Sequence, residues 1–78
     1  MVNESNTLSR FIKEKRKQAR LTQPELATKA GVGLRFVRDL EQGKITLKMD
    51  KVNQVLKLFG HELGPVLLDR NLLIHEES

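Results

Sequence analysis

The chain has 78 residues, a net charge of +4 and no cysteine. This length suits one small domain with a modest core, and the lack of cysteine excludes disulfides and thiolate metal sites. No apolar run approaches the length of a membrane span, and the first residues, MVNESNTL, contain no apolar signal core. We therefore expect a cytoplasmic protein.

The positive charge is concentrated in the first half of the chain. Residues 1–44 carry a net +5, whereas residues 45–78 carry a net −1. A polyanion is the natural partner of such a segment, although on charge alone a solvated surface is the simpler explanation. The pattern of predicted helices is needed to distinguish a polyanion-binding surface from a solvated one.

The first predicted helix spans about residues 7–20. We expect the polar residues 1–6 before it to be disordered. Its apolar side chains recur at helical spacing, and they are Leu8, Phe11, Ile12 and Ala19. The basic residues between them are expected to face water.

The second helix has a well-marked beginning and end. Thr22 suits the N-cap, and Glu25 three residues later completes a capping box. Leu21 and Leu26 have the spacing of a hydrophobic staple. Gly31 is expected to end the helix in the left-handed conformation.

The third helix is predicted to begin only one or two residues later, near Gly33. At 100° per residue, Val37 and Leu40 share one side, whereas Arg35 and Arg38 point the other way. The first side is expected to pack on the core. The second side is expected to stay exposed.

A fourth helix is predicted over about residues 47–59, followed by a tail. The segment ELGPVLLD in this tail suits an edge strand, but it could also begin a fifth helix with Pro65 at its first position. We favour the strand. The tail is also the expected dimerisation surface, formed by Leu63, Val66, Leu67 and Leu68.

The short connection between the second and third helices points to DNA binding. Two helices joined by so tight a turn must cross steeply, which leaves the second one protruding along the surface. A protruding helix fits the major groove of B-DNA, and this is the helix-turn-helix arrangement. We expect a mainly α DNA-binding domain over residues 7–60 and a dimerisation or partner-binding tail over residues 61–78.

The stretch LTQPELATKAGVGLRFVRDLEQGK resembles the helix-turn-helix of the XRE/Cro-like repressors, and the similarity extends over residues 8–60. It implies a lambda-repressor-like domain of four to five helices. Within that family, RFVRDLEQGK followed by DKVNQVLKLFG is similar to HipB-type antitoxins. Those proteins are dimers that bind DNA and partner a HipA-like kinase toxin.

The resemblance also implies roles for individual residues. Positions expected to contact bases or phosphates are Gln23, Gly33, Leu34, Arg35, Arg38, Asp39, Lys44 and Thr46. Arg16 and Glu41 match a buried ion pair that ties the first helix to the third. Gly33 replaces the serine or threonine that usually caps the third helix, and Leu34 replaces a common polar residue.

The predicted function is a homodimeric repressor that binds a near-palindromic double-stranded DNA operator. We expect this repressor to be the autoregulating antitoxin of a HipBA-like operon and to be associated with the nucleoid when it is bound to DNA. Two alternatives remain open. One is a protein-binding module that neutralises a toxin through its C-terminal tail, and the other is a stand-alone phage-type repressor. We expect no enzyme, cofactor or metal site, since His61 and His75 are isolated and Ser9 has no evident triad partners.

Overall fold

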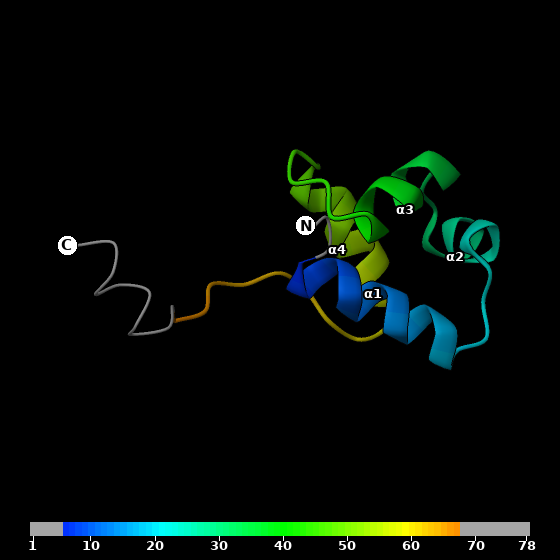
Figure 1. Ribbon diagram of the computed structural model, residues 1–78, viewed down its shortest axis with the longest axis horizontal. Helices are drawn as coiled ribbons and strands as arrows, with labels where there is room; N and C mark the ends of the chain where they lie inside the picture. Colours follow the sequence, from blue (N-terminus) through cyan, green and yellow to red (C-terminus); the bar gives the residue numbers. More distant parts are fainter. Residues whose placement is uncertain (1–5, 68–78) are drawn as a thin grey trace.

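Four helices form the part of the chain that the computed structural model describes, residues 6–67 (Figure 1). They are α1 (Thr7–Gln18), α2 (Gln23–Ala30), α3 (Leu34–Glu41) and α4 (Met49–Leu58). The predicted mainly α, four-helix class is thereby confirmed. None of these helices is both long enough and apolar enough to cross a membrane. The disorder expected over residues 1–5 and the role expected of Leu68 lie outside the described residues.

The first helix begins with a cap that we did not predict. The Asn6 side chain accepts a hydrogen bond from the Ser9 amide at 2.8 Å, and the Ser9 hydroxyl accepts one from the Asn6 amide, also at 2.8 Å. This reciprocal pair satisfies two amides at the helix start. Asn6, which we assigned to the N-terminal segment, is therefore the N-cap of α1, and the fully buried Ser9 has a capping role.

The predicted capping box of α2 is confirmed. Thr22 Oγ1 accepts from the Glu25 amide at 3.2 Å, and Glu25 Oε1 accepts from the Thr22 amide at 2.8 Å. Because the carboxylate accepts this backbone hydrogen bond and lies in the first turn, the pKa of Glu25 is lowered from its ordinary value. The box therefore works best when Glu25 is ionised.

Acid should weaken this cap, and Glu25→Gln should remove that dependence. Because the folded-state pKa of Glu25 is lowered, its contribution is present above the unfolded-state value near 4.5 and is lost as the pH falls through the folded-state value. We expect the wild type to lose more stability than Glu25→Gln between pH 5 and 3, measured by urea unfolding. Parallel losses in the two proteins would show that the carboxylate charge is not used by the cap.

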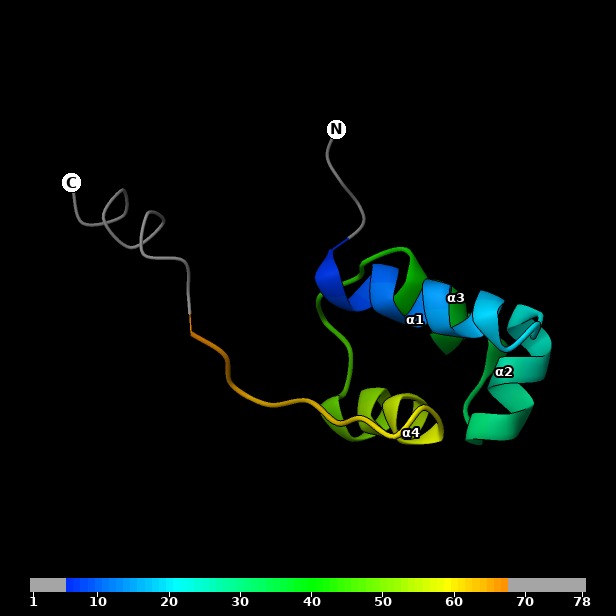
Figure 2. The same cartoon turned by 90° about the horizontal axis from the view of Figure 1, so that it is seen from below.

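All four helices contribute to one core. α3 packs against α1 and α2, and α2 also packs against α4, which lies across the bundle from α1 (Figure 2). The fully or almost fully buried apolar side chains are Ile12, Leu26, Ala27, Val37, Leu40, Val52, Val55 and Leu56. This packing leaves only one side of α3 exposed.

After α4 the chain turns back along the helix instead of forming the expected strand. Residues 61–67 have no regular secondary structure, and the Leu63 amide donates to Asn53 Oδ1 at 2.7 Å. The half-buried Leu63 side chain packs on the chain's own core, and its expected role in dimerisation stays a prediction. A strand needs a neighbouring strand, and beyond Leu63 the segment leaves the helical body (Figures 1 and 2).

His61 fixes the beginning of this segment against α1. Its ring meets the Phe11 ring edge to face, with the centroids 4.7 Å apart. Its Nδ1 lies 2.7 Å from the Phe59 carbonyl oxygen, which fits an N–H donor on that nitrogen. The Lys15 ammonium lies over the same Phe11 ring, 5.5 Å from its centre. The direction in which the tail leaves α4 is thus set by packing.

Candidate nucleic-acid interface

A three-residue connection, residues 31–33, sets the position of α3 relative to α2. Gly31 adopts a φ of 76°, and its amide and that of Val32 both donate to the Ala27 carbonyl, at 2.9 and 3.0 Å. Gln54 of α4 holds the same turn, since its Nε2 donates to the carbonyls of Ala30 and Gly31 at 3.1 and 3.2 Å. The end of α2 is therefore bonded to α4. The sequence did not indicate this role for Gln54, because an exposed polar residue on α4 has no distinctive pattern.

Substituting Gly31 should loosen the turn. A side chain at φ 76° costs about 1–2 kcal/mol, and the added Cβ would lie 3.3 Å from Gln54 Nε2. We expect Gly31→Ala to lower the free energy of unfolding by about this amount, measured by chemical denaturation. Gly33→Ala is the matched control, because its Cβ would have no neighbour within 4 Å and its φ is −77°. An equal loss in both variants would refute the explanation.

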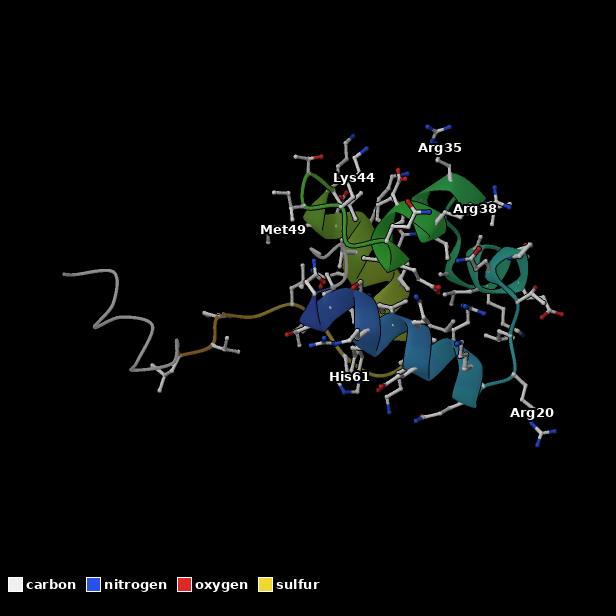
Figure 3. The ribbon with its side chains drawn as sticks, viewed as in Figure 1. Arg20, Arg35, Arg38, Lys44, Met49 and His61 are labelled. Atoms are coloured by element: carbon white, nitrogen blue, oxygen red, sulfur yellow. The ribbon has the colours of Figure 1, made fainter. Side chains whose placement is uncertain are left out.

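The two sides of α3 differ as predicted. Val37 and Leu40 are buried in the core, whereas Arg35 and Arg38 are exposed. Figure 3 shows both arginines and Lys44 on the side of the molecule away from α1, while Arg20 and His61 lie on the opposite side. The outward side is shallowly hollowed between Leu34, Arg35, Arg38, Asp39 and Gln42. It offers a strip of guanidinium and amide donors to a ligand that lies along the helix.

Residues at the two ends of α3 complete this surface. Gly33 is the N-cap without a side-chain hydrogen bond, so the usual serine or threonine contribution is missing. Leu34 is half-buried against the core, which leaves part of its side chain for an apolar contact. At the other end, Lys44 Nζ lies 3.6 Å from Asp39 Oδ2, and Thr46 is exposed. The structure brings Leu34, Asp39 and Lys44 to the side of Arg35 and Arg38, and the contacts of all these residues with DNA stay predictions.

A buried ion pair holds the inner side of α3 in place. Arg16 of α1 meets Glu41 of α3 through two hydrogen bonds, Nε to Oε2 at 2.6 Å and Nη2 to Oε1 at 3.0 Å. Their side chains are only 13% and 2% exposed. This is the pair that the resemblance implies. The hydrogen bond to Glu41 raises the pKa of Arg16 above its ordinary value, so the guanidinium stays charged wherever the domain folds.

The same pair also connects to α2. Arg16 Nη1 donates to the Leu21 carbonyl at 2.9 Å, and Gln23 Nε2 donates to Glu41 Oε1 at 3.1 Å. Gln23 therefore braces α3 from the first turn of α2. The phosphate contact expected of it stays a prediction. Two carboxylate oxygens thus fix three helices through directional bonds, which keeps the outer side of α3 in one orientation.

Comparison with known proteins agrees with this arrangement. Residues 12–64 match the helix-turn-helix family, so the match covers α2 to α4 and most of α1. An HTH-type transcriptional regulator of Sinorhizobium fredii, y4mF, is 58% identical over 45 residues. Those residues make up 58% of this chain and 59% of the relative, so this chain spans well under two thirds of that protein.

The match covers more than half of the chain and includes every element that positions the exposed side of α3. The short connection between the packed helices α2 and α3, the left-handed Gly31 and the outward arginines are the features that a DNA-binding helix pair requires. The chain therefore belongs to the XRE-type helix-turn-helix family of DNA-binding domains.

Proposed function

We propose that this protein is a transcriptional regulator that binds specific double-stranded DNA and represses the promoter over which it binds. The observation that carries the proposal is the outer side of α3, where Arg35 and Arg38 are exposed while Glu41 on the inner side is clamped to Arg16. A rigid helix with two outward guanidiniums presents bidentate donors to guanine O6 and N7 in the major groove. Family membership and the relationship to a transcriptional regulator support it.

The charge of the helical body suits a polyanion. Residues 6–60 carry thirteen basic and five acidic side chains, a net +8. With α3 in the groove, Lys44 and Thr46 lie beyond its C-terminal end, near the position of the sugar–phosphate backbone. Gln23 is in the first turn of α2, where the backbone N–H groups and the positive end of the helix dipole favour a phosphate. Phosphate contacts supply affinity, and the arginines supply specificity.

In the proposed mechanism two copies bind together. Their α3 helices enter successive major grooves about 34–36 Å apart on a near-palindromic operator. Bound over its own promoter, the dimer blocks transcription in the cytoplasm. The resemblance to HipB-type antitoxins supports a narrower proposal, in which the same dimer also holds a HipA-like kinase toxin. Expression beside such a kinase, followed by co-purification of the two chains, tests that narrower proposal by itself.

Selection of bound duplexes from a random DNA pool tests the proposed function directly. We expect a consensus with two related half-sites, and an affinity that falls about 10³-fold or more between 50 and 200 mM salt. That steep dependence reports the counterions released by lysine and arginine. Selection that yields no consensus, or binding insensitive to salt, would contradict the proposal.

A further inference from the structure

Two large apolar side chains lie exposed on the helical body beside the interface. Ile45, in the connection after α3, is 87% exposed, and Met49, the first residue of α4, is 68% exposed. We call these two residues the apolar patch. Each follows an exposed lysine in the sequence, Lys44 before Ile45 and Lys48 before Met49. A small domain gains stability by burying apolar side chains. An exposed apolar pair next to the functional surface therefore indicates a site that another molecule covers.

The described tail carries the other exposed apolar pair. Val66 is 83% exposed and Leu67 is 98% exposed. We call residues 64–67 the arm. It leaves the body at the end where α4 begins, which is also the end where Met49 lies (Figures 1 and 3). Pro65 restricts Gly64 to extended backbone, which favours an arm that points away from its own body.

We propose that the apolar patch of one chain is the docking site for the arm of a second copy, so that two chains exchange arms. The inference rests on the proposed function, because a near-palindromic DNA site is matched by a protein dimer with two-fold symmetry. Within one chain the arm does not cover the patch, since all four side chains remain exposed. In a symmetric pair each arm can reach the partner's patch at the same interface.

Area and charge favour arm exchange over contact between the two patches alone. Ile45 and Met49 offer far less surface than the roughly 800 Å² per partner of a standard stable interface. Val66 and Leu67 of the partner add two further large side chains to each side. The sequence of residues 61–78 has four acidic and one basic residue, whereas residues 44–51, which include the patch, have three lysines and one acidic residue, Asp50. The arm itself is uncharged, but the acidic residues Glu62 and Asp69 lie on either side of it in the sequence and favour a basic surface.

The position of the patch also agrees with the proposed DNA complex. When two α3 helices lie one DNA turn apart, the bodies meet on one flank of α3. One flank carries Pro24, Glu25, Thr28 and Lys29 of α2, which are exposed and mostly polar. The other flank carries the apolar patch. The large exposed apolar side chains Ile45 and Met49 lie on the second flank, so the two-fold axis is expected there.

Crosslinking between two different variants tests arm exchange, and the chain has no cysteine that could interfere. Met49→Cys and isotope-labelled Leu67→Cys are purified separately, mixed and treated with a short bismaleimide. Mass spectrometry should find a crosslinked dimer that contains one chain of each kind. Arg20→Cys, which is exposed on the opposite side of the body, replaces Met49→Cys as control and should give little mixed product. No mixed product, or equal yields from both mixtures, would overturn the proposal.

Self-association and DNA binding are then measured on Ile45→Asn/Met49→Gln, which removes the apolar surface without adding a negative charge beside Lys44 and Thr46. Gln18→Asn/Ala19→Gln is the control, because it makes an equally neutral change at exposed positions at the far end of α1. In sedimentation velocity the patch variant should be a monomer and the control a dimer. On the selected duplex the patch variant should bind roughly 10²-fold more weakly, and on a single half-site it should match the control.

The two readouts separate this inference from the proposed function. If neither the wild type nor the control binds any duplex, the DNA-binding proposal fails, and sedimentation still decides whether the patch holds the dimer. If the patch variant remains a dimer, the docking site is wrong, whatever the DNA affinity. A half-site affinity that falls with the full-site affinity would also overturn it, because Ile45 and Met49 would then act on DNA and not on the second copy.

Discussion

Arg16→Met is expected to lower the free energy of unfolding by about 3–5 kcal/mol, the usual cost of removing one partner from a buried ion pair. The Glu41 side chain, 2% exposed, would keep only the hydrogen bond from Gln23, and the Leu21 carbonyl would lose its guanidinium donor. A domain of this length has a total stability of roughly 4–12 kcal/mol. We therefore expect a large fall in the urea midpoint and in the melting temperature, measured by circular dichroism.

A second variant distinguishes the loss of the attraction between Arg16 and Glu41 from the cost of leaving the Glu41 carboxylate buried without its partner. Arg16→Met/Glu41→Leu removes both charges and keeps apolar volume, so it should regain most of the lost stability. The single variant is expected to be the worse of the two. Equal destabilisation in the single and double variants would show that the buried carboxylate is not the source of the cost. Lys17→Met, at an exposed position on the same helix, should cost less than 1 kcal/mol.

Local patterns in the sequence predicted much of this fold. The α2 boundaries followed from Thr22, Glu25 and Gly31, because caps and a left-handed glycine act within a few residues. The two sides of α3 followed from the spacing of Val37 and Leu40. The ion pair came from the family resemblance, since Arg16 and Glu41 are too far apart in sequence for helical periodicity to connect them.

Features that depend on tertiary contacts could not be predicted in the same way. Asn6 was assigned to the polar N-terminal segment, and its sequence context did not indicate that its side chain would accept a hydrogen bond from the Ser9 amide. Gln54 contacts Ala30, the last residue of α2, across 24 residues of sequence. The tail was misjudged because the strand pattern of ELGPVLLD describes side-chain alternation, whereas a strand also requires a neighbour. The exposed Ile45 and Met49 were missed since a helix pattern cannot show which apolar residues the core leaves uncovered.

Arg35→Ala/Arg38→Ala is expected to weaken binding to the selected duplex by about 2–6 kcal/mol, since each arginine–guanine contact is worth about 1–3 kcal/mol. That corresponds to a loss of roughly 30-fold to 10⁴-fold, measurable by fluorescence anisotropy at fixed salt. Stability should change little, because both side chains are exposed and neither takes part in the Arg16–Glu41 network. Unfolding curves and sedimentation of the variant should therefore match those of the wild type.

Specificity is the sharper consequence of the same change. The control variant Lys17→Ala/Arg20→Ala removes the same charge. Arg20 lies on the side opposite α3 (Figure 3), and the Lys17 side chain is exposed on α1. This variant should weaken binding to the selected and the random duplex by the same modest factor, because only the long-range field is altered. The α3 variant should instead lose most of its preference for the selected duplex, since phosphate contacts carry no sequence information. If affinity and preference survived in the α3 variant, some other surface would have to recognise the bases, and the assignment of α3 as the recognition helix would be wrong.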